Sequence, residues 1–288
     1  MSANRMQIVG TPANLEEKSA RLRQIVSMQP ALIVAYSGGV DSAFLAWMAH
    51  TVLGERMRAV IADSPSLART HLEDALAFAR EYGIPVDVVE TRELDNPAYT
   101  RNDSSRCFHC KDELFAVLER YGEAHDLAAI AYGVNADDQG DFRPGQQAAR
   151  DHRVLAPLLE AELTKAEIRD LACQAGLRVW DKPASACLSS RIEYGRTVTP
   201  EVLGIIERGE DALHELGFRQ IRVRHHGETV RIEIARDEMG RALTEEMARK
   251  FAAIFKGLGF KFVTLDLEGF RSGSMNQLLS AEELMHRR

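Results

Sequence analysis

The chain has 288 residues, of which 45% are hydrophobic and 27% charged, and its formal net charge is -7. This composition is typical of a soluble globular protein of two domains. No apolar run approaches the roughly 18 to 20 residues that cross a bilayer, and the N-terminal residues lack the apolar core of a secretory signal, so we expect a cytoplasmic protein without membrane contact. The negative charge argues against a partner that is nucleic acid, because domains that bind it are usually basic.

Apolar and amphipathic segments alternate through the first part of the chain. Helices are expected at 14–28, 43–53, 69–82, 112–125 and 164–175, the last with a capping box of Thr164 and Glu167. Strands are expected at 31–36, 57–62, 86–90 and 128–132. This order predicts right-handed βαβ units and a parallel sheet, whose ligands bind beyond the carboxyl ends of the strands.

The first expected strand leads directly into Ser37-Gly38-Gly39-Val40-Asp41-Ser42, and an expected helix follows. Successive backbone N–H groups in such a turn, together with the helix N-terminus, suit phosphate oxygens. The GxxxxGK[ST] pattern and its lysine are absent, which excludes a Walker loop. The hexapeptide resembles the pyrophosphate-binding loop (PP loop) of the ATP pyrophosphatase superfamily, whose members cleave ATP between its α and β phosphates. An ordinary βα turn capped by Asp41 or Ser42 is the alternative.

Two more expected strands end at the same edge of the sheet. Asp63-Ser64 ends the second strand, where the adenosine should approach, although a solvated strand end explains it equally well. Gly133 ends the fourth strand and allows a close backbone approach to a ligand. Asp137 and Asp138 follow and could hold the magnesium that accompanies ATP, with a polar turn as the alternative.

Four cysteines in a reducing compartment indicate metal binding, catalysis or packing rather than disulfides. Cys107 and Cys110 form a CxxC pair, which is compatible with half a zinc site, a redox pair or part of an iron–sulfur site. Cys187 lies in a loop rich in Pro, Ser and Ala and is a poor candidate for packing. Cys173 lies within an expected amphipathic helix, and we expect it to be a small buried hydrophobe.

From about residue 197 the pattern becomes that of a second, α+β domain. Helices are expected at 200–216 and 243–257, and strands at 219–225, 229–235 and 260–267. The 14 Lys and Arg residues of 197–288 nearly balance the 15 Asp and Glu residues, which argues against a domain that grips tRNA.

Charged side chains share one face of the expected hairpin in this second domain. Arg222 and Arg224 lie on the same side of the first strand, and Arg231 and Glu233 lie beside them on the second. Such a face can bind phosphate or carboxylate through bidentate contacts. An internally paired, solvated face is the alternative.

Five motifs follow one another along the chain: SGGVDS, RCFHCK, GVNADDQGDFRPG, KPASACLSSRIEYG and LEGFRSGSMN. With them the chain resembles the LarE family, ATP-dependent sulfur transferases that serve lactate racemase maturation, from about residue 12 to 280. The resemblance implies an α/β fold with an adenine nucleotide alpha hydrolase-like (PP-loop) domain over 12–196. It also implies a smaller C-terminal α+β domain over 197–288 for substrate binding and oligomerisation.

The resemblance further implies a substrate, pyridinium-3,5-biscarboxylic acid mononucleotide. Its two carboxylates would be adenylated in turn and converted to thiocarboxylates, which later hold nickel in a pincer cofactor. Arg222 and Arg224 would bind its anionic groups, with Arg191 as a further candidate. The residues expected to bind ATP are Ser37, Gly38, Gly39, Asp41, Ser42, Ser64 and Gly133.

Members of the family differ in the source of the sulfur. Where a lone cysteine stands at the position of Cys187, its thiolate attacks the acyl-adenylate and gives up its sulfur, which leaves dehydroalanine. Other members carry three cysteines that hold a 4Fe-4S cluster, whose unique iron carries an additional sulfide. Because Cys107 and Cys110 accompany Cys187 here, we favour the cluster, with Cys187 as catalytic residue in either route. We also expect a homo-oligomer and a cellular sulfide donor.

Three other functions are compatible with the PP loop. A tRNA thiolase also uses CxxC with a distant cysteine, but it would need a basic RNA-binding face. An amide-forming synthetase of the NAD or GMP kind would need an ammonia source, and no glutaminase domain fits in 288 residues. A non-catalytic nucleotide sensor could keep the loop, but the retention of Asp41, Ser42 and the three cysteines argues against it.

Overall fold

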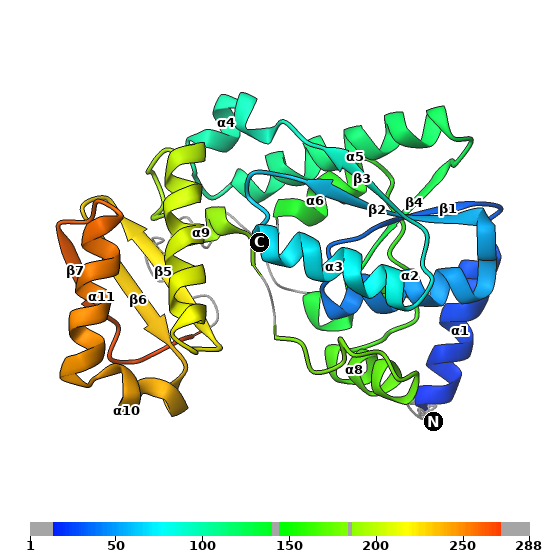
Figure 1. The fold of residues 1–288 in the computed structure, drawn as a ribbon. Helices are drawn as coiled ribbons and strands as arrows, with labels where there is room; N and C mark the ends of the chain where they lie inside the picture. The colour runs from blue at the N-terminus through cyan, green and yellow to red at the C-terminus, as the bar shows by residue number, and fades with distance from the viewer. Residues whose placement is uncertain (1–13, 140–143, 184–185, 272–288) are drawn as a thin grey trace, which may run out of the picture.

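The computed structural model describes residues 14–139, 144–183 and 186–271 (Figure 1). The motif residues at 140–143, 184–185 and 272–276 therefore lie outside the described part of the chain. Within the described part, no helix combines the length and the apolar character that crossing a membrane requires.

A four-stranded parallel sheet, which we call the nucleotide sheet, forms the larger part of the molecule. Its strands are β1 (Leu32–Ala35), β2 (Met57–Asp63), β3 (Val86–Glu90) and β4 (Ala129–Tyr132). They lie in the order β3-β2-β1-β4, so the chain moves outward on one side of β1 and returns to β4 on the other. The gap between the ends of β1 and β4 is a topological switch point, where sheets of this type bind ligands. The expected parallel α/β fold is confirmed.

Helices cover both faces of the nucleotide sheet (Figure 1). Alternate residues of β1 serve the two faces: Leu32 and Val34 join one apolar cluster, and Ile33 and Ala35 join another. The first cluster includes residues of α1 (Leu15–Ser27), α2 (Val40–Leu53), α3 (Arg69–Glu81), α7 (Pro157–Glu160) and α8 (Lys165–Gln174). The second includes residues of α5 (Arg106–Ala124) and α6 (Pro144–Asp151).

Helix α5 begins at Arg106 and not near residue 112, as the sequence suggested. The segment that precedes residue 112 contains no glycine or proline, so nothing stops the helix from extending through it. Cys107 and Cys110 therefore lie in the first turns of α5 and, being three residues apart, on the same side of the helix. The short helix α4 (Pro97–Thr100) precedes this segment.

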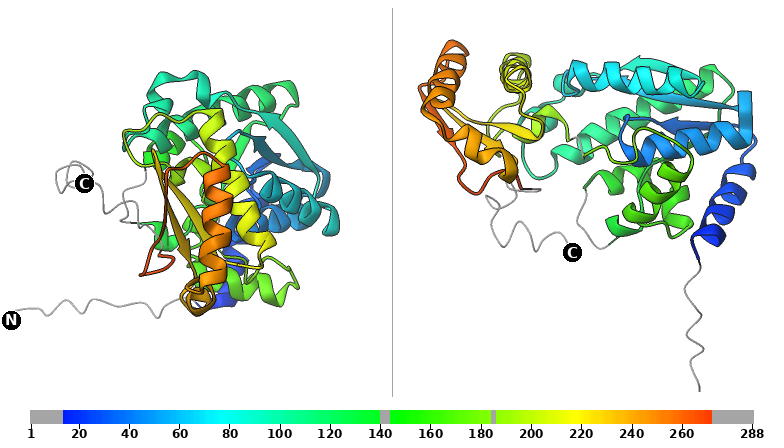
Figure 2. Two further views of the ribbon diagram at one scale, coloured as in Figure 1. Left: turned by 60° about the vertical axis from the view of Figure 1, so that its left-hand side comes forward. Right: turned by 60° about the horizontal axis from the view of Figure 1, so that its bottom comes forward.

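A smaller three-stranded sheet, which we call the C-terminal sheet, forms the second part (Figure 2). Strands β5 (Ile221–His226) and β6 (Thr229–Ile234) are antiparallel, and β7 (Phe262–Leu265) lies parallel to β6. Helices α9 (Pro200–Glu215) and α11 (Glu245–Gly257) cover one face of this sheet (Figure 2), and α10 (Met239–Ala242) precedes α11. The expected α+β pattern of this region is therefore present.

Candidate active site

The 37–42 loop joins β1 to α2 at the carboxyl edge of the nucleotide sheet. Gly38 has a φ of +69°, and a Cβ there would lie 2.5 Å from the Cβ of Ala75, so only glycine fits. Gly39 is the N-cap of α2 and makes no side-chain cap. The Ser42 hydroxyl closes the loop, because it accepts from the amide of Ser37 (3.1 Å) and donates to the carbonyl of Gly39 (3.2 Å). The result is a glycine turn at a helix N-terminus, which is an anion site.

Gly133 lies directly after β4 and packs against the start of α2. A Cβ at this position would lie 2.8 Å from the amide nitrogen of Ser42. The glycine is therefore required by the close approach of two backbone segments, and it keeps the β4 end next to the PP loop.

Two lysines from distant segments supply positive charge that the loop itself lacks. Lys165, the first residue of α8, forms an ion pair with Asp41, from which it is separated by 124 residues. Lys182 donates to the carbonyl of Gly38 (3.0 Å) across 144 residues and pairs with Asp74 of α3. Lysine side chains at such a turn would neutralise phosphate oxygens. Sequence reasoning missed both, because the only signal is a lysine beside a capping box and another before a proline.

The magnesium candidates lie in a short turn after β4 and are engaged with backbone amides. Asp137 accepts from the amide of Lys165 (2.8 Å), and Asp138 accepts from the amide of Asn135 (3.1 Å). Asn135 also donates to Asp41 (3.4 Å), so the β4 end and the PP loop are linked. Within the described residues, no three His, Cys, Asp or Glu side chains are arranged to hold a metal ion.

Ser64 follows β2 and belongs to a buried polar network rather than to a solvated strand end. Its hydroxyl donates to Glu93, whose side chain is only 2% exposed, and accepts from the amide of Ser66 (3.0 Å). Sequence reasoning did not single out Glu93, because an acidic residue after a strand is common.

Cys107 and Cys187 both lie near enough to Cys110 for their charges to act on it. Cys107 and Cys187 are exposed, and Cys110 is half-buried. Burial, followed by the charge of Cys187, raises the pKa of Cys110 to about 12. Cys173 is exposed on α8, so our expectation that it is a buried packing residue is wrong.

Arg106 connects the start of α5 to the segment after Cys187. Its guanidinium donates to the carbonyl of Ser189 (2.7 Å) and to the side chain of Asn102. Burial lowers the pKa of Arg106, but the charges of Cys187 and Cys107 outweigh this effect and raise the pKa above its ordinary value. The three thiols do not surround a common metal-ion position as they stand, although three cysteines are the kind of donor that an iron–sulfur cluster uses.

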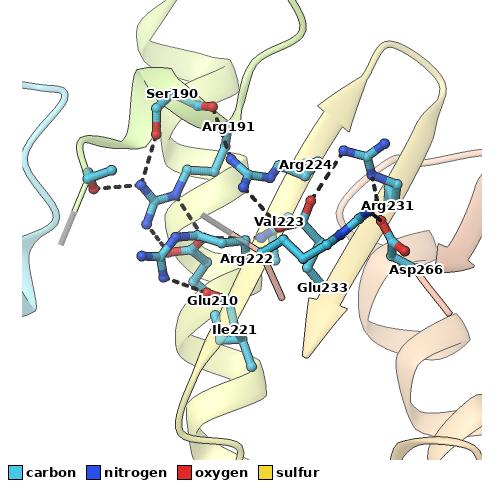
Figure 3. Close-up of polar contacts among 12 residues, drawn as sticks. Ser190, Arg191, Glu210, Ile221, Arg222, Val223, Arg224, Arg231, Glu233 and Asp266 are labelled. Atoms are coloured by element: carbon cyan, nitrogen blue, oxygen red, sulfur yellow. Dashed lines mark hydrogen bonds and ion pairs between the residues drawn. The ribbon is translucent and has the colours of Figure 1, made fainter. Parts of the chain in front are cut away.

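Arg191 is 1% exposed and binds the backbone beside Cys187, and Figure 3 shows its side chain next to Ser190 and Glu210. Its guanidinium pairs with Glu210 of α9 through Nε (3.0 Å) and Nη2 (3.1 Å). Nη1 donates to the carbonyls of Ala186 and Cys187, the latter at 2.8 Å. The substrate contact suggested for Arg191 does not fit this burial, because protein groups occupy the guanidinium. Arg191 fixes the backbone beside Cys187 instead.

Arg222 and Arg224 lie on one face of β5, as the alternation predicts (Figure 3). Arg224 is 5% exposed and pairs with the fully buried Glu233 (2.9 Å), which also accepts from Arg231 (3.2 Å). Burial, followed by the charge of Arg191, lowers the pKa of Arg222 to about 10. An anion bound beside Arg222 would offset both of these effects. The face is internally paired, with Arg224 and Glu233 buried and with Arg222 and Arg231 half-buried.

Comparison with known proteins agrees with these features. A family model described as NAD synthase matches residues 15–114. The chain is 41% identical, over 92% of its length, to an uncharacterized protein of Synechocystis, of which it covers 99%. It is 25% identical, over 71% of its length, to a chain of the glutamine-hydrolyzing GMP synthase of Pyrococcus furiosus, of which it covers 70%.

One relative carries an informative name. The chain is 33% identical, over 94% of its length, to pyridinium-3,5-bisthiocarboxylic acid mononucleotide synthase of Lactiplantibacillus plantarum, of which it covers 98%. Together with the PP loop at the edge of a parallel sheet, this near full-length similarity shows that the chain belongs to the LarE family, that of pyridinium-3,5-bisthiocarboxylic acid mononucleotide synthase.

Proposed function

We propose that this protein is an ATP-dependent sulfur transferase that converts pyridinium-3,5-biscarboxylic acid mononucleotide to its bisthiocarboxylic form, for a nickel-pincer cofactor of lactate racemase. One observation carries the proposal: Lys182 contacts Gly38 of the PP loop, and Cys187 follows only five residues later. Five residues span at most roughly 18 Å, so the backbone of Cys187 lies within that distance of the backbone of Lys182. The name of the synthase from Lactiplantibacillus plantarum supports the choice of substrate.

The first step activates a carboxylate. A carboxylate oxygen of the substrate attacks the α-phosphorus of ATP, the bond from this phosphorus to the bridging oxygen breaks, and pyrophosphate leaves with the electron pair. Amides of the glycine turn, together with Lys165 and Lys182, would hold the pyrophosphate as its charge develops. The magnesium that accompanies ATP would neutralise phosphate charge, with Asp137 and Asp138 as the candidate residues that would hold it.

The second step exchanges oxygen for sulfur. Sulfide adds to the acyl carbon, the bond to the adenylate oxygen breaks, AMP leaves, and one proton is released with the thiocarboxylate. AMP is a far better leaving group than a carboxylate oxygen, which explains why ATP is required. A 4Fe-4S cluster on Cys107, Cys110 and Cys187 would supply the sulfide, replenished by a cellular donor.

Arg222 and Arg224 would bind the phosphate or the second carboxylate of the substrate. A mononucleotide with two carboxylates carries several negative charges, and arginines recognise such groups through charge-assisted hydrogen bonds. Burial, and after it the charge of Arg191, lowers the pKa of Arg222 to about 10, and a bound anion would offset both effects, which supports this assignment.

Pyrophosphate release tests the substrate. Protein purified without oxygen should release pyrophosphate in the presence of the pyridinium mononucleotide and not in the presence of tRNA. Release that depends on tRNA would identify a tRNA thiolase instead. Light scattering on the same preparation checks the proposed homo-oligomer.

The sulfur source requires a second measurement. A cluster enzyme should bind about four irons per chain, turn over repeatedly with added sulfide and keep Cys187 at full mass. A sacrificial enzyme should stop after one sulfur per chain and show dehydroalanine at position 187 by mass spectrometry. Cys173→Ser is the matched control for Cys187→Ser, because Cys173 is also exposed but lies on α8.

A further inference from the structure

Helix α3 supports the PP loop from one side. Its Asp74 pairs with Lys182, the lysine that donates to the carbonyl of Gly38. Its Ala75 lies so close to Gly38 that only a glycine fits there. The carbonyl of Ala75 also accepts from the hydroxyl of Tyr36 (2.8 Å), which directly precedes the loop. The position of α3 therefore decides where the glycine turn and Lys182 lie.

The chain before α3 does not cap this helix. The N-cap residue is Ala68, which has no hydrogen-bonding side chain, and no acidic residue stands in the first turn. The first residue is Arg69, whose positive charge is unfavourable at a helix N-terminus. Its guanidinium turns back to Asp63 and to the carbonyls of Ser64 (2.9 Å) and Leu67 (2.8 Å). The backbone amides at the start of α3 are therefore left to partners elsewhere in the molecule or to solvent.

One such partner comes from α9, in the part of the molecule that contains the C-terminal sheet. Glu207 accepts a hydrogen bond from the backbone amide of Arg69 through Oε1 (2.6 Å), across 138 residues. A carboxylate at this position satisfies an end amide and balances the positive end of the helix dipole. Three residues later on the same side of α9, Glu210 pairs with Arg191 and accepts from the amide of Val223 in β5 (3.1 Å). Helix α9 thus contacts both the helix that supports the PP loop and the strand that carries the candidate substrate arginines.

We propose that Glu207 is a positioning residue for the PP loop: it caps α3 from α9, and through Asp74 and Ala75 it holds Lys182 and the glycine turn in place to bind ATP. The inference rests on the proposed binding of ATP phosphates by this loop. It makes the C-terminal part of the molecule a contributor to ATP affinity. Glu207 contacts no reacting atom, so its loss should weaken ATP binding and leave the rate of the chemical step unchanged.

The test compares Glu207→Ala with the double variant Glu207→Ala/Ala68→Ser by isothermal titration with ATP. Glu207→Ala should raise the Kd for ATP by about 3- to 10-fold, the factor that corresponds to a typical helix cap. Ala68→Ser supplies a capping hydroxyl from the N-cap position of α3 itself and should restore most of the affinity. Glu215→Ala, on an exposed glutamate of α9, is the matched control and should leave the Kd unchanged.

Two further measurements separate this role from a general loss of stability. In pyrophosphate release with the pyridinium mononucleotide, the KM for ATP should rise by the same factor in Glu207→Ala, and kcat should stay unchanged. Hydrogen exchange of residues 68–81 should be faster in Glu207→Ala and slow again in the double variant, because the serine caps α3 without replacing any contact of α9.

An unchanged Kd for ATP in folded Glu207→Ala, or a raised Kd that Ala68→Ser does not lower, would overturn the inference and leave the proposed reaction standing. Wild-type protein that binds no ATP would overturn the proposed function, and the inference with it. If Glu207→Ala does not fold, Glu207→Gln replaces it, because glutamine keeps an acceptor oxygen and loses only the charge. Its Kd for ATP should rise by about 2- to 5-fold, the range of helix-dipole effects, and an unchanged value would overturn the inference.

Discussion

The PP loop (residues 37–42) and the arginine face of β5 (Arg222 and Arg224) both suit anions, but the first is built from backbone amides and the second from side chains. The PP loop is made of backbone amides, with Gly38 at a φ of +69° and with lysines brought from distant segments. The arginine face is made of buried side chains whose carboxylate partners, such as Glu233, lie beside them. Substitutions in the first region should therefore reduce ligand binding, whereas substitutions in the second should reduce stability as well.

Gly39→Val, in the PP loop, should have the largest effect of the substitutions proposed here, and this effect should be on ATP cleavage. The position has a φ of -77°, and the nearest atom to an added Cβ is the hydroxyl of Ser37 at 3.6 Å, so valine fits the fold. A side chain between the amides and the pyrophosphate should reduce ATP cleavage by about 100- to 1000-fold, the loss typical of a removed anion-stabilising donor. Pyrophosphate release measures the effect, and circular dichroism checks the fold.

The control for Gly39→Val is its neighbour. Gly38→Ala places a Cβ at 2.5 Å from that of Ala75 and should lower the free energy of unfolding. A folded Gly39→Val protein with wild-type pyrophosphate release would show that this loop does not hold the pyrophosphate.

Arg224→Ala should behave in the opposite way, because it should have a large effect on the free energy of unfolding. It removes one of the two arginines that face the fully buried Glu233. The buried carboxylate of Glu233 would then lose Arg224 and keep Arg231 as a cationic partner. The free energy of unfolding should fall by about 3 kcal/mol, the lower limit of the range for breaking a buried ion pair, because Arg231 remains. Adding Glu233→Gln should recover much of this loss in urea unfolding. No recovery in the double variant would contradict the pairing.

Arg222→Ala and Lys182→Met should separate the two regions by ligand. Each removes a charge-assisted contact worth about 1.5 to 3 kcal/mol, which corresponds to roughly 10- to 150-fold in apparent affinity. Arg222→Ala should weaken the mononucleotide and leave ATP unchanged, whereas Lys182→Met should weaken ATP and leave the mononucleotide unchanged. Isothermal titration with each ligand measures both. If both variants of the arginine face, Arg222→Ala and Arg224→Ala, keep full affinity for the mononucleotide, this face does not bind the substrate.

The smallest expected effects are the pH responses of two histidines, one in each half of the molecule. Burial lowers the pKa of His152, but hydrogen bonds with Glu119 and Asp112 outweigh it and raise the pKa above its ordinary value. Burial, with the charge of Arg196 as a second cause, lowers the pKa of His225. The stability contributed by His152 is complete below pH 6.5 and is lost as the pH rises through its raised pKa, whereas that of His225 is complete above pH 6.5 and is lost as the pH falls.

The free energy of unfolding of His152→Gln should therefore approach that of the wild type as the pH rises above about 6.5. That of His225→Gln should approach the wild-type value as the pH falls below about 6.5. The effect at His152 should be below about 1 kcal/mol, because ion pairs with exposed partners contribute little. The effect at the half-buried His225 should be of similar size. Thermal unfolding between pH 5 and about pH 8 measures both. Parallel curves for the wild type and either variant would contradict the assigned direction.

The sequence predicted the elements that depend on local pattern. The parallel sheet followed from alternating periodicity, and the PP loop from a glycine pair between a strand and a helix, because both are fixed by residues close together in the chain. The two faces of β5 followed from the period of two in a strand, which also located Arg222 and Arg224. Of these, the parallel sheet and the family are confirmed, and the roles of the individual site residues stay predictions.

The features that the sequence did not predict depend on tertiary contacts. Lys165 and Lys182 reach the PP loop from the start of α8 and from the segment after it, which no local pattern announces. Arg191 was grouped with the substrate ligands because it is cationic and near Cys187, but its pairing with Glu210 requires knowledge of where α9 lies. The early start of α5 at Arg106 was missed because polar residues around the CxxC pair resemble a loop.

The Cys187 segment is fastened within a few residues to both halves of the molecule. Arg106 of α5 binds it at Ser189, and Arg191, anchored on Glu210 of α9, binds it at Ala186 and Cys187. Because this segment is held by both α5 and α9, it cannot stay in place when one of these helices moves. Any rotation of α9 and the C-terminal sheet relative to the nucleotide sheet would pull on the backbone of Cys187. If the two halves move relative to each other when a substrate binds, the backbone of Cys187 moves with them.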